Sequence, residues 1–237
     1  MNLKNIIITL LLISSGIFYY NLTEPASAEL ININVARVID GDTIEDSTGQ
    51  KYRLKGINTP EKSKDYYEEA KQYLKERLEN KSVKIENHGR DKYGRILAHI
   101  FKNNQNINEQ ILKEGLGTLY YYEKDKHFKE LKNAEEKARE NEKGLWKKST
   151  NENCINLISL KETESPKRCT NNEQLILENS CHQEIQITFK DDATHIYEET
   201  LQPTSTFTKN FSCIFNNDGD TLYAWDSEGL LIFHRYP

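Results

Sequence analysis

The order of short patterned segments between residues 31 and 101 constrains the fold more than any other feature of this chain. Apolar and polar side chains alternate within these segments, as in half-buried β-strands, and turn-forming residues separate them. The expected strands span residues 31–39, 43–45, 51–57, 83–86 and 96–101. A helix is expected over residues 66–78, where apolar residues recur at helical spacing. Five strands with a helix after the third predict an OB-fold, a small Greek-key barrel.

Two further helices are expected after the last barrel strand, over residues 107–113 and 127–143, because apolar residues recur there and glycines follow. This half of the chain is therefore predicted to be α+β, a five-stranded barrel with about three helices. Residues 147–153 are polar and without periodicity, so we interpret them as a linker.

The C-terminal part of the chain has a different pattern. Short alternating or apolar runs, separated by polar turns, predict a small all-β module. The runs span residues 174–178, 184–189, 196–201, 207–211, 222–225 and 230–234. All four cysteines lie in this part, and an even number in an exported chain favours two disulfides. The pairing of Cys154, Cys169, Cys181 and Cys213 stays open; the alternative, a zinc site, lacks a C-x-x-C pair and histidines at ligand spacing.

The N-terminal residues indicate export. Lys4 precedes an apolar run over residues 6–20, and the small residues Ala26-Ser27-Ala28 follow. This order is typical of a secretory signal peptide cleaved after Ala28, with an uncleaved membrane anchor as the alternative. No other stretch is apolar enough to cross a bilayer, so we expect a secreted protein, extracellular or periplasmic, without stable membrane insertion after cleavage. The expected organisation is a signal peptide over 1–28, a barrel domain over 29–149 and an all-β module over 150–237.

Charge is divided unevenly between the two halves. Residues 29–149 carry 25 basic and 22 acidic side chains, whereas residues 150–237 carry 6 basic and 14 acidic ones. A mildly basic first half suits a polyanionic substrate, and the acidic second half is not expected to be the main binding face for one.

Three short segments and one arginine carry the chemistry of the first half. The segments are Asp40-Gly41-Asp42-Thr43, Asn58-Thr59-Pro60-Glu61 and Asp91-Lys92-Tyr93-Gly94-Arg95, and the arginine is Arg53. Carboxylate and amide oxygens suit a hard divalent cation, and arginines offer a planar fork of donors that matches a phosphate. Placed together, these groups would serve phosphodiester hydrolysis. The first tetrapeptide is weak alone, because Asp218-Gly219-Asp220-Thr221 repeats it without the companions; we interpret that copy as a hairpin turn.

In order and spacing, these segments resemble the active-site segments of the staphylococcal nuclease (thermonuclease) family, over about residues 33–146. The resemblance implies a calcium-dependent enzyme that hydrolyses phosphodiester bonds of DNA and RNA and leaves 3′-phosphates. Low sequence specificity is expected, since phosphate contacts carry no base information. A cation and two guanidinium groups would stabilise the charge that develops on the phosphate in the transition state.

The resemblance also implies a role for each residue that matches the family motif. Asp42, Asn58 and Thr59 would bind Ca²⁺, the last through its backbone carbonyl. Arg53 and Arg95 would grip the scissile phosphate, and Glu61 would orient or deprotonate the attacking water. Lys92, Tyr93 and Tyr121 would contact the nucleotide, and no histidine is assigned to catalysis.

One position departs from the family pattern. Asn58 stands where the family usually has aspartate, as the second metal-binding carboxylate. Its amide oxygen still suits calcium, but it brings no charge. We therefore expect weaker calcium binding than in the relatives, or a calcium-rich medium, and tighter binding after Asn58→Asp.

Two other functions fit parts of the same sequence. An OB-fold that grips single strands but has lost turnover through Asn58 would need no general base, so Glu61 argues against it. Alternatively, the C-terminal module is the main effector and attaches the chain to a surface or partner. The partner of that module stays open, and we expect a monomer.

Overall fold

The structure is a computed structural model that describes residues 30–120, 124–161, 173–193, 195–212, 214–215 and 219–236. The expected signal peptide, Tyr121, Cys169 and Cys213 lie outside these residues. None of the helices within the described ranges is long and apolar enough to span a membrane.

Five strands of the first half close into a mixed barrel. Each strand from β1 to β3 pairs antiparallel with its neighbour, β1 also pairs with β5, and β5 pairs with β6. A parallel pairing of β3 with β6, with Tyr52 opposite Ile96, closes the ring. The barrel strands are β1 (Leu30–Val38), β2 (Thr43–Asp46), β3 (Lys51–Leu54), β5 (Ser82–Arg90) and β6 (Ile96–Lys102). The predicted OB-fold is thus confirmed.

Helices and short pairings complete this half. The helices are α2 (Tyr67–Leu78), α3 (Ile107–Lys113), α4 (Phe128–Glu140) and the 3₁₀-helix η1 (Gly144–Trp146). β4 (Ile57–Asn58) pairs with β8 (Thr118–Leu119), and β7 (Gln105–Asn106) extends β6. Ala70, Leu74 and Leu78 form the buried face of α2, as their helical spacing predicts. α4 ends three residues earlier than the predicted helix, because the chain turns at 141–143 before η1.

The second half is a sandwich of two sheets. The smaller sheet has the order β13-β10-β9 and the larger one β12-β11-β14-β15. The strands are β9 (Ile155–Lys161), β10 (Glu173–Asn179), β11 (Ile185–Lys190), β12 (Ile196–Leu201), β13 (Ser205–Phe211), β14 (Asp220–Trp225) and β15 (Leu230–Tyr236). Leu175, Leu177, Phe189 and Leu222 are among the fully buried side chains between the sheets. The all-β prediction is confirmed, and β9 is a strand that it missed.

The second Asp-Gly-Asp-Thr tetrapeptide is not a hairpin turn. β13 lies in the smaller sheet and β14 in the larger one, so the strands before and after the tetrapeptide do not pair with each other. Asp220 is the first residue of β14 and is 2 % exposed. The hairpin interpretation was therefore wrong, because β13 and β14 belong to different sheets. Turn-forming residues show that the chain changes direction, but they do not show with which strand the following strand will pair.

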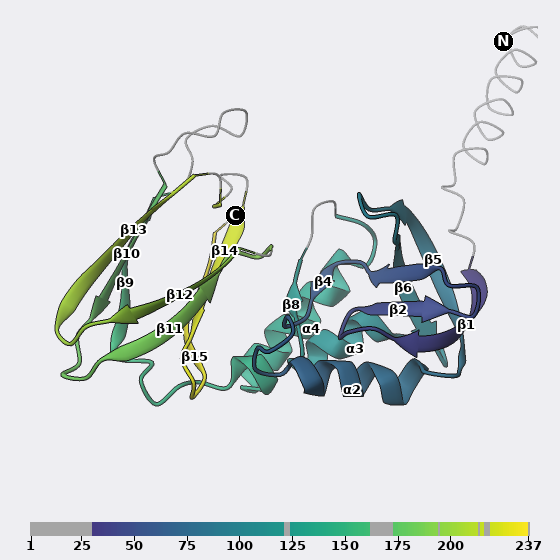
Figure 1. The fold of residues 1–237 in the computed structure, drawn as a ribbon, viewed down its shortest axis with the longest axis horizontal. Helices are drawn as coiled ribbons and strands as arrows, with labels where there is room; N and C mark the ends of the chain where they lie inside the picture. The colour runs from purple at the N-terminus through teal and green to yellow at the C-terminus, as the bar shows by residue number, and fades with distance from the viewer. Residues whose placement is uncertain are drawn as a thin grey trace, which may run out of the picture.

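The sandwich packs against the helical side of the barrel. Figure 1 shows the two sheets beside the barrel, with β4, β8 and α4 on the side that faces them. Ala138, Trp146, Tyr223 and Leu230 form a buried cluster between the two halves. The segment interpreted as a linker is part of this contact, because Lys148 bridges to Leu230 and Ser149 is 3 % exposed. It is a bound connection and not a free tether.

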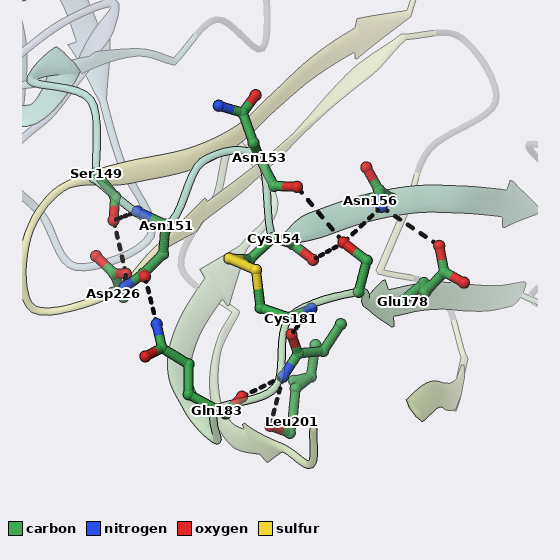
Figure 2. The surroundings of a disulfide bond; sticks show 12 residues. Ser149, Asn151, Asn153, Cys154, Asn156, Glu178, Cys181, Gln183, Leu201 and Asp226 are labelled. Atoms are coloured by element: carbon green, nitrogen blue, oxygen red, sulfur yellow. Dashed lines mark hydrogen bonds between the residues drawn. A yellow bond between two sulfur atoms is a disulfide. The ribbon is translucent and has the colours of Figure 1, made fainter. Parts of the chain in front are cut away.

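One predicted disulfide lies in the described part of the chain. Cys154 and Cys181 are bonded across a sequence separation of 27, with Cα atoms 5.1 Å apart. Figure 2 shows that the bond ties the segment before β9 to the end of β10, close to the polar contacts of Ser149, Asn151 and Asp226. It therefore anchors the sandwich beside the connection to the barrel.

Candidate active site

Asp42 is fixed by the loop that precedes β2 and by the segment after β4. A Cβ on Gly41 would lie 2.6 Å from Thr59 Oγ1 and 2.8 Å from Ala70 Cβ, so only glycine lets the loop approach α2 this closely. The backbone N–H and the hydroxyl of Thr59 both donate to Asp42 Oδ2, each at 3.0 Å. The Asp42 carboxylate is therefore held in one orientation, largely buried.

Arg53 joins the carboxylate of Asp42 to the amide of Asn58. Its Nη2 lies 3.1 Å from Asp42 Oδ2 and donates to Asn58 Oδ1 at 2.5 Å, while Nη1 donates to the carbonyl of Leu54 at 2.9 Å. The β2–β3 pairing sets Arg53 opposite Thr43 and so brings the guanidinium to Asp42. One oxygen of Asp42 and one of Asn58 therefore converge on a single cationic group.

Arg95 approaches the same site from the loop between β5 and β6. Asp91 holds this loop, since it accepts from Tyr93 N at 2.9 Å, Arg95 N at 3.0 Å and Arg95 Nε at 2.7 Å. Burial acts to raise the pKa of Asp91, but the hydrogen bonds from Arg95 and Tyr93 outweigh it and lower the pKa. Arg95 Nη1 lies 3.4 Å from Thr43 Oγ1, which donates to Asp42 Oδ1 at 3.1 Å. Arg95 is thus connected to Asp42 through one hydroxyl.

Asp40 is a site residue that sequence reasoning did not assign. Its Oδ1 accepts from the backbone N–H of Asp42 at 3.1 Å. Burial, and then the charge of Asp42, raises the pKa of Asp40 to about 6. The signal was present in the tetrapeptide itself, whose two carboxylates flank one glycine. A second acid beside Asp42 adds to the attraction of this corner for a cation.

The other predicted residues lie around this centre. Glu61 is exposed at the edge of the site, and its carboxylate makes no hydrogen bond or ion pair with the residues that the structure describes. Tyr93 is 72 % exposed, with Lys92 Nζ 5.1 Å and Arg95 Cζ 5.6 Å from its ring centre. The structure therefore brings Asp42, Arg53, Asn58 and Thr59 into direct contact, places Arg95 one hydroxyl away, and leaves Glu61, Lys92 and Tyr93 at the rim.

A cleft between the two halves adjoins the site. It encloses about 1270 Å³ and is lined by Asn58, Thr59 and Glu61 on the barrel side and by Thr188 and Lys190 of β11 on the other. The turn after β11 reaches the site itself, because Asn58 Nδ2 donates to Ala193 O at 2.9 Å and to Asp192 O at 3.3 Å. No motif in the sequence could have indicated this contact, since the partners are about 135 residues apart.

The oxygens at the centre fit a hard divalent cation. Asp42 has a carboxylate, Asn58 an amide oxygen and Thr59 a backbone carbonyl, which are the ligand types that a divalent cation such as calcium accepts. Among the described residues, a second cluster of ligand type comprises His88, His99 and Asp125, whose ligand atoms lie within 4.8 Å of one another. Lys55 Nζ lies 3.3 Å from Asp125 Oδ2 in that cluster.

An OB barrel with this group of acids and arginines on its surface has the equipment of a nuclease. Residues 51–148 match the family model described as staphylococcal nuclease homologue. A thermonuclease of Staphylococcus hyicus is 35% identical over 137 residues, covering 51% of this chain and 81% of the relative. A thermonuclease of Staphylococcus intermedius is 33% identical over 126 residues (48% and 75%), and an uncharacterized endonuclease of Haemophilus influenzae is 30% identical over 140 residues (57% and 78%).

This chain belongs to the staphylococcal nuclease family. It is therefore a hydrolase that acts on phosphodiester bonds of nucleic acid and depends on a divalent metal. The described structure and the comparisons agree on the fold of the first half, and the family match ends where the connection to the sandwich begins.

Proposed function

We propose that this protein is an exported, calcium-dependent nuclease that hydrolyses DNA and RNA with low sequence specificity and leaves 3′-phosphates. The observation that carries the proposal is the convergence of Asp42 Oδ2 and Asn58 Oδ1 on Arg53 Nη2, at 3.1 and 2.5 Å. Two oxygen ligands can bind a cation, and the guanidinium beside them can bind the phosphate whose charge that cation neutralises.

In this proposal the arginines bind the scissile phosphate and stabilise its developing charge. Arg53 and Arg95 present several N–H donors toward the corner beside Asp42, and Asp91 fixes the direction of Arg95 through two hydrogen bonds, from Arg95 N and Nε. Donors held in place before reaction need no reorganisation when charge builds up on the phosphate. When bound, calcium supplies further positive charge at the same oxygens, held by Asp42, Asn58 and the carbonyl of Thr59.

Glu61 is the proposed general base. Its exposed carboxylate lies two residues beyond Thr59, at the mouth of the cleft, where water has free access. A carboxylate in reach of a water can orient it and accept its proton as it attacks phosphorus. Lys92 and Tyr93, in the loop that Asp91 holds, would contact the neighbouring phosphate and nucleotide of the bound strand.

Export is supported by the chain itself. The Cys154–Cys181 disulfide indicates an oxidising compartment, and the N-terminal pattern is that of a signal peptide. We further propose that residues 29–149 form the nuclease domain, that residues 150–237 form the appended module, and that the mature chain is a monomer.

The test compares the purified mature chain with Glu61→Gln on DNA and RNA, with millimolar calcium and with a chelator. Loss of a general base lowers the rate about 10²- to 10⁴-fold while substrate binding is retained. Glu68→Gln is the matched control, because Glu68 is another exposed acid seven residues away on α2. Chelation should abolish cleavage, and the products should carry phosphatase-sensitive 3′ ends.

Two results would contradict the proposal. Cleavage that persists with chelator, or that is unchanged in Glu61→Gln, would exclude the assigned mechanism. Binding of DNA without any cleavage at millimolar calcium would instead indicate a non-catalytic OB-fold that binds single strands.

A further inference from the structure

The side chain of Asn58 is held from both halves of the molecule. Its Oδ1 accepts from Arg53 Nη2 at 2.5 Å, and its Nδ2 donates to the carbonyl oxygens of Ala193 and Asp192 at 2.9 and 3.3 Å. Asn58 is 8 % exposed, so little water competes for these bonds. Both polar atoms of the amide are therefore hydrogen-bonded: the oxygen accepts from one donor, and the nitrogen donates to two acceptors.

An amide must be oriented before it can serve a cation, whereas a carboxylate need not be. Aspartate offers two equivalent oxygens, but asparagine offers one oxygen and one NH₂ group that only donates. A half-turn of the Asn58 amide would set its NH₂ against the guanidinium of Arg53 and its oxygen against the two carbonyls. The carbonyls of Asp192 and Ala193 and the guanidinium of Arg53 thus select the same orientation, in which the amide oxygen faces Arg53.

Buried acids on either side hold residues 191–193 of this turn through hydrogen bonds. The carboxylate of Asp191, which is 1 % exposed, accepts from His195 N at 3.1 Å and from His195 Nδ1 at 2.6 Å. Asp220 Oδ1 accepts from Asp192 N at 3.1 Å and from Thr221 N at 2.7 Å. Asp220 belongs to the second Asp-Gly-Asp-Thr tetrapeptide, whose buried carboxylate thus supports the turn that touches the active site.

Contacts between the halves fix the distance from the turn to Asn58. Arg235 Nη1 lies 2.6 Å from Glu135 Oε2, and Glu135 Oε1 accepts from the backbone of Leu119, in the strand that pairs with Asn58. Trp225 Nε1 donates to Leu145 O at 2.8 Å, beside the buried Trp146. The sandwich is therefore docked through a buried ion pair and an aromatic cluster.

We propose that the β11–β12 turn is a positioning element of the active site, in which the carbonyls of Asp192 and Ala193 hold the Asn58 amide with its oxygen toward the cation position. The inference rests on the proposed role of Asn58 as a cation ligand. It assigns to the C-terminal module a part in the nuclease site, and it explains how an uncharged ligand serves where relatives carry a carboxylate. Asn58→Asp then does more than add charge, because it sets an oxygen against two carbonyl oxygens and loosens the docking.

The test is a four-protein cycle on the mature chain: wild type, Trp225→Ala, Asn58→Asp and the double variant. Calcium affinity is measured by isothermal titration calorimetry. With Asn58 in place, Trp225→Ala should weaken binding about tenfold, the usual scale for loss of a group that orients a metal ligand. In the Asn58→Asp background, the same change should alter binding less than about twofold, since either oxygen of a carboxylate can face the cation.

Docking has its own readout. The chain has two tryptophans, so in Trp225→Ala the emission comes from Trp146 alone, which is fully buried at the contact. A red shift of that emission reports undocking. Ile158→Ala, an exposed change on the far sheet, is the matched control and should leave both emission and affinity unchanged. Asp220→Ala, which loosens the turn without touching the aromatic cluster, gives the same cycle by a second route.

Equal losses of affinity with and without the Asn58→Asp change would overturn the inference, because the module would then act only on general stability. Unchanged affinity together with a shifted Trp146 emission would overturn it as well. A wild-type chain that neither binds calcium nor cleaves DNA would overturn the proposed function. A wild type that does both, with no difference between the two backgrounds, would overturn the positioning role alone.

Discussion

Individual side chains of the site are fixed by hydrogen bonds before any substrate arrives. Asp42 is held by both donors of Thr59, and Asp91 holds Arg95. Sequence reasoning identified the residues that carry these bonds, because their motif has a fixed order. It did not assign a role to Asp40, because an aspartate before a glycine is typical of a turn. It did not identify Ala193, because that residue contributes only its backbone carbonyl. The functional roles of the residues stay predictions.

Arg53→Lys is expected to lower kcat about 10²- to 10³-fold, the scale for loss of one preorganised donor in a transition state. Lysine keeps the charge, but it has no planar fork to reach Asp42 and Asn58 while it donates to Leu54. Steady-state cleavage of a defined oligonucleotide measures the effect. Arg90→Lys is the control: Arg90 is exposed and its side chain donates to Gln50 and Gly94, so an equal loss there would mean that charge density alone matters.

Among the secondary-structure elements, the sequence predicted those whose patterns are local. β1 alternates apolar and polar residues over its first half, and α2 has helical spacing, so their own residues display the pattern. β9 was missed because only Ile155 of its seven residues is buried, so its pattern is weak. The crossing from β13 to β14 was missed because partner choice depends on the other sheet and not on the turn.

His99, on β6, is expected to make the barrel sensitive to acid. Burial lowers the pKa of His99 to about 4, and its Nε2 lies 3.0 Å from Asp125 Oδ2. An unfolded histidine takes up a proton near pH 6.5, so the unfolded state binds more protons between about pH 6.5 and 4. The free energy of unfolding should fall across that window as pH falls, by up to about 3 kcal/mol.

Urea unfolding at pH 7.5, 5.5 and 4.5 measures this dependence in the wild type and in His99→Gln. The variant should lose less stability between the first and last pH than the wild type does, because it has no proton to take up. His182→Gln, at an exposed position, should follow the wild type. Parallel curves for His99→Gln and wild type would rule out His99 as the source.

The junction between α3 and η1 depends on two glycines in backbone contact. Gly144 has a φ of +54°, and a Cβ there would lie 2.3 Å from the carbonyl oxygen of Gly115. Gly144→Ala is expected to cost more than about 2 kcal/mol, from the unfavourable φ and the forced separation of the two segments. Gly49→Ala shares a positive φ but meets nothing within 4 Å, so its cost should stay near about 1 kcal/mol.

Thermal unfolding compares the two alanine variants, and emission in a Trp225→Phe background, where Trp146 is the one tryptophan, adds a local readout. Trp146 follows Gly144 by two residues, so displacement of η1 should expose its ring. Equal stability of Gly144→Ala and Gly49→Ala would show that the junction yields without cost.

The molecule as a whole is organised by contacts that no local pattern reports. The sequence predicted a barrel, a sandwich and a linker between them, but it did not show that the linker contacts the sandwich. Ser149 instead donates its backbone N–H to Leu230, and Leu230 donates to Lys147. Contacts of this kind join residues about 80 apart, and only the assembled fold brings them together.

The Cys154–Cys181 disulfide is expected to stabilise the sandwich by about 3–4 kcal/mol, the scale for a closed loop of its length. The double change Cys154→Ser, Cys181→Ser should lower the urea midpoint of the sandwich, followed by emission in a Trp146→Phe background, where Trp225 is the one tryptophan. Ser159→Ala, at an exposed position on β9, is the control and should leave the midpoint in place. A midpoint that does not move in the double variant would show that the sheets need no covalent tie.

The last two strands of the sandwich also determine the order in which the barrel folds and the sandwich docks on it. β14 and β15 carry Asp220, Tyr223, Trp225 and Arg235, which support the turn at Asn58 or bind the barrel. A ribosome delivers these residues after the whole barrel, and domains fold as they emerge. The barrel can close as soon as its own strands are made, yet the docked arrangement has to wait until residues 220–236 are free. The barrel is therefore complete before the sandwich can dock on it. During that interval the Asn58 side chain lacks its hydrogen bonds to the carbonyls of Asp192 and Ala193.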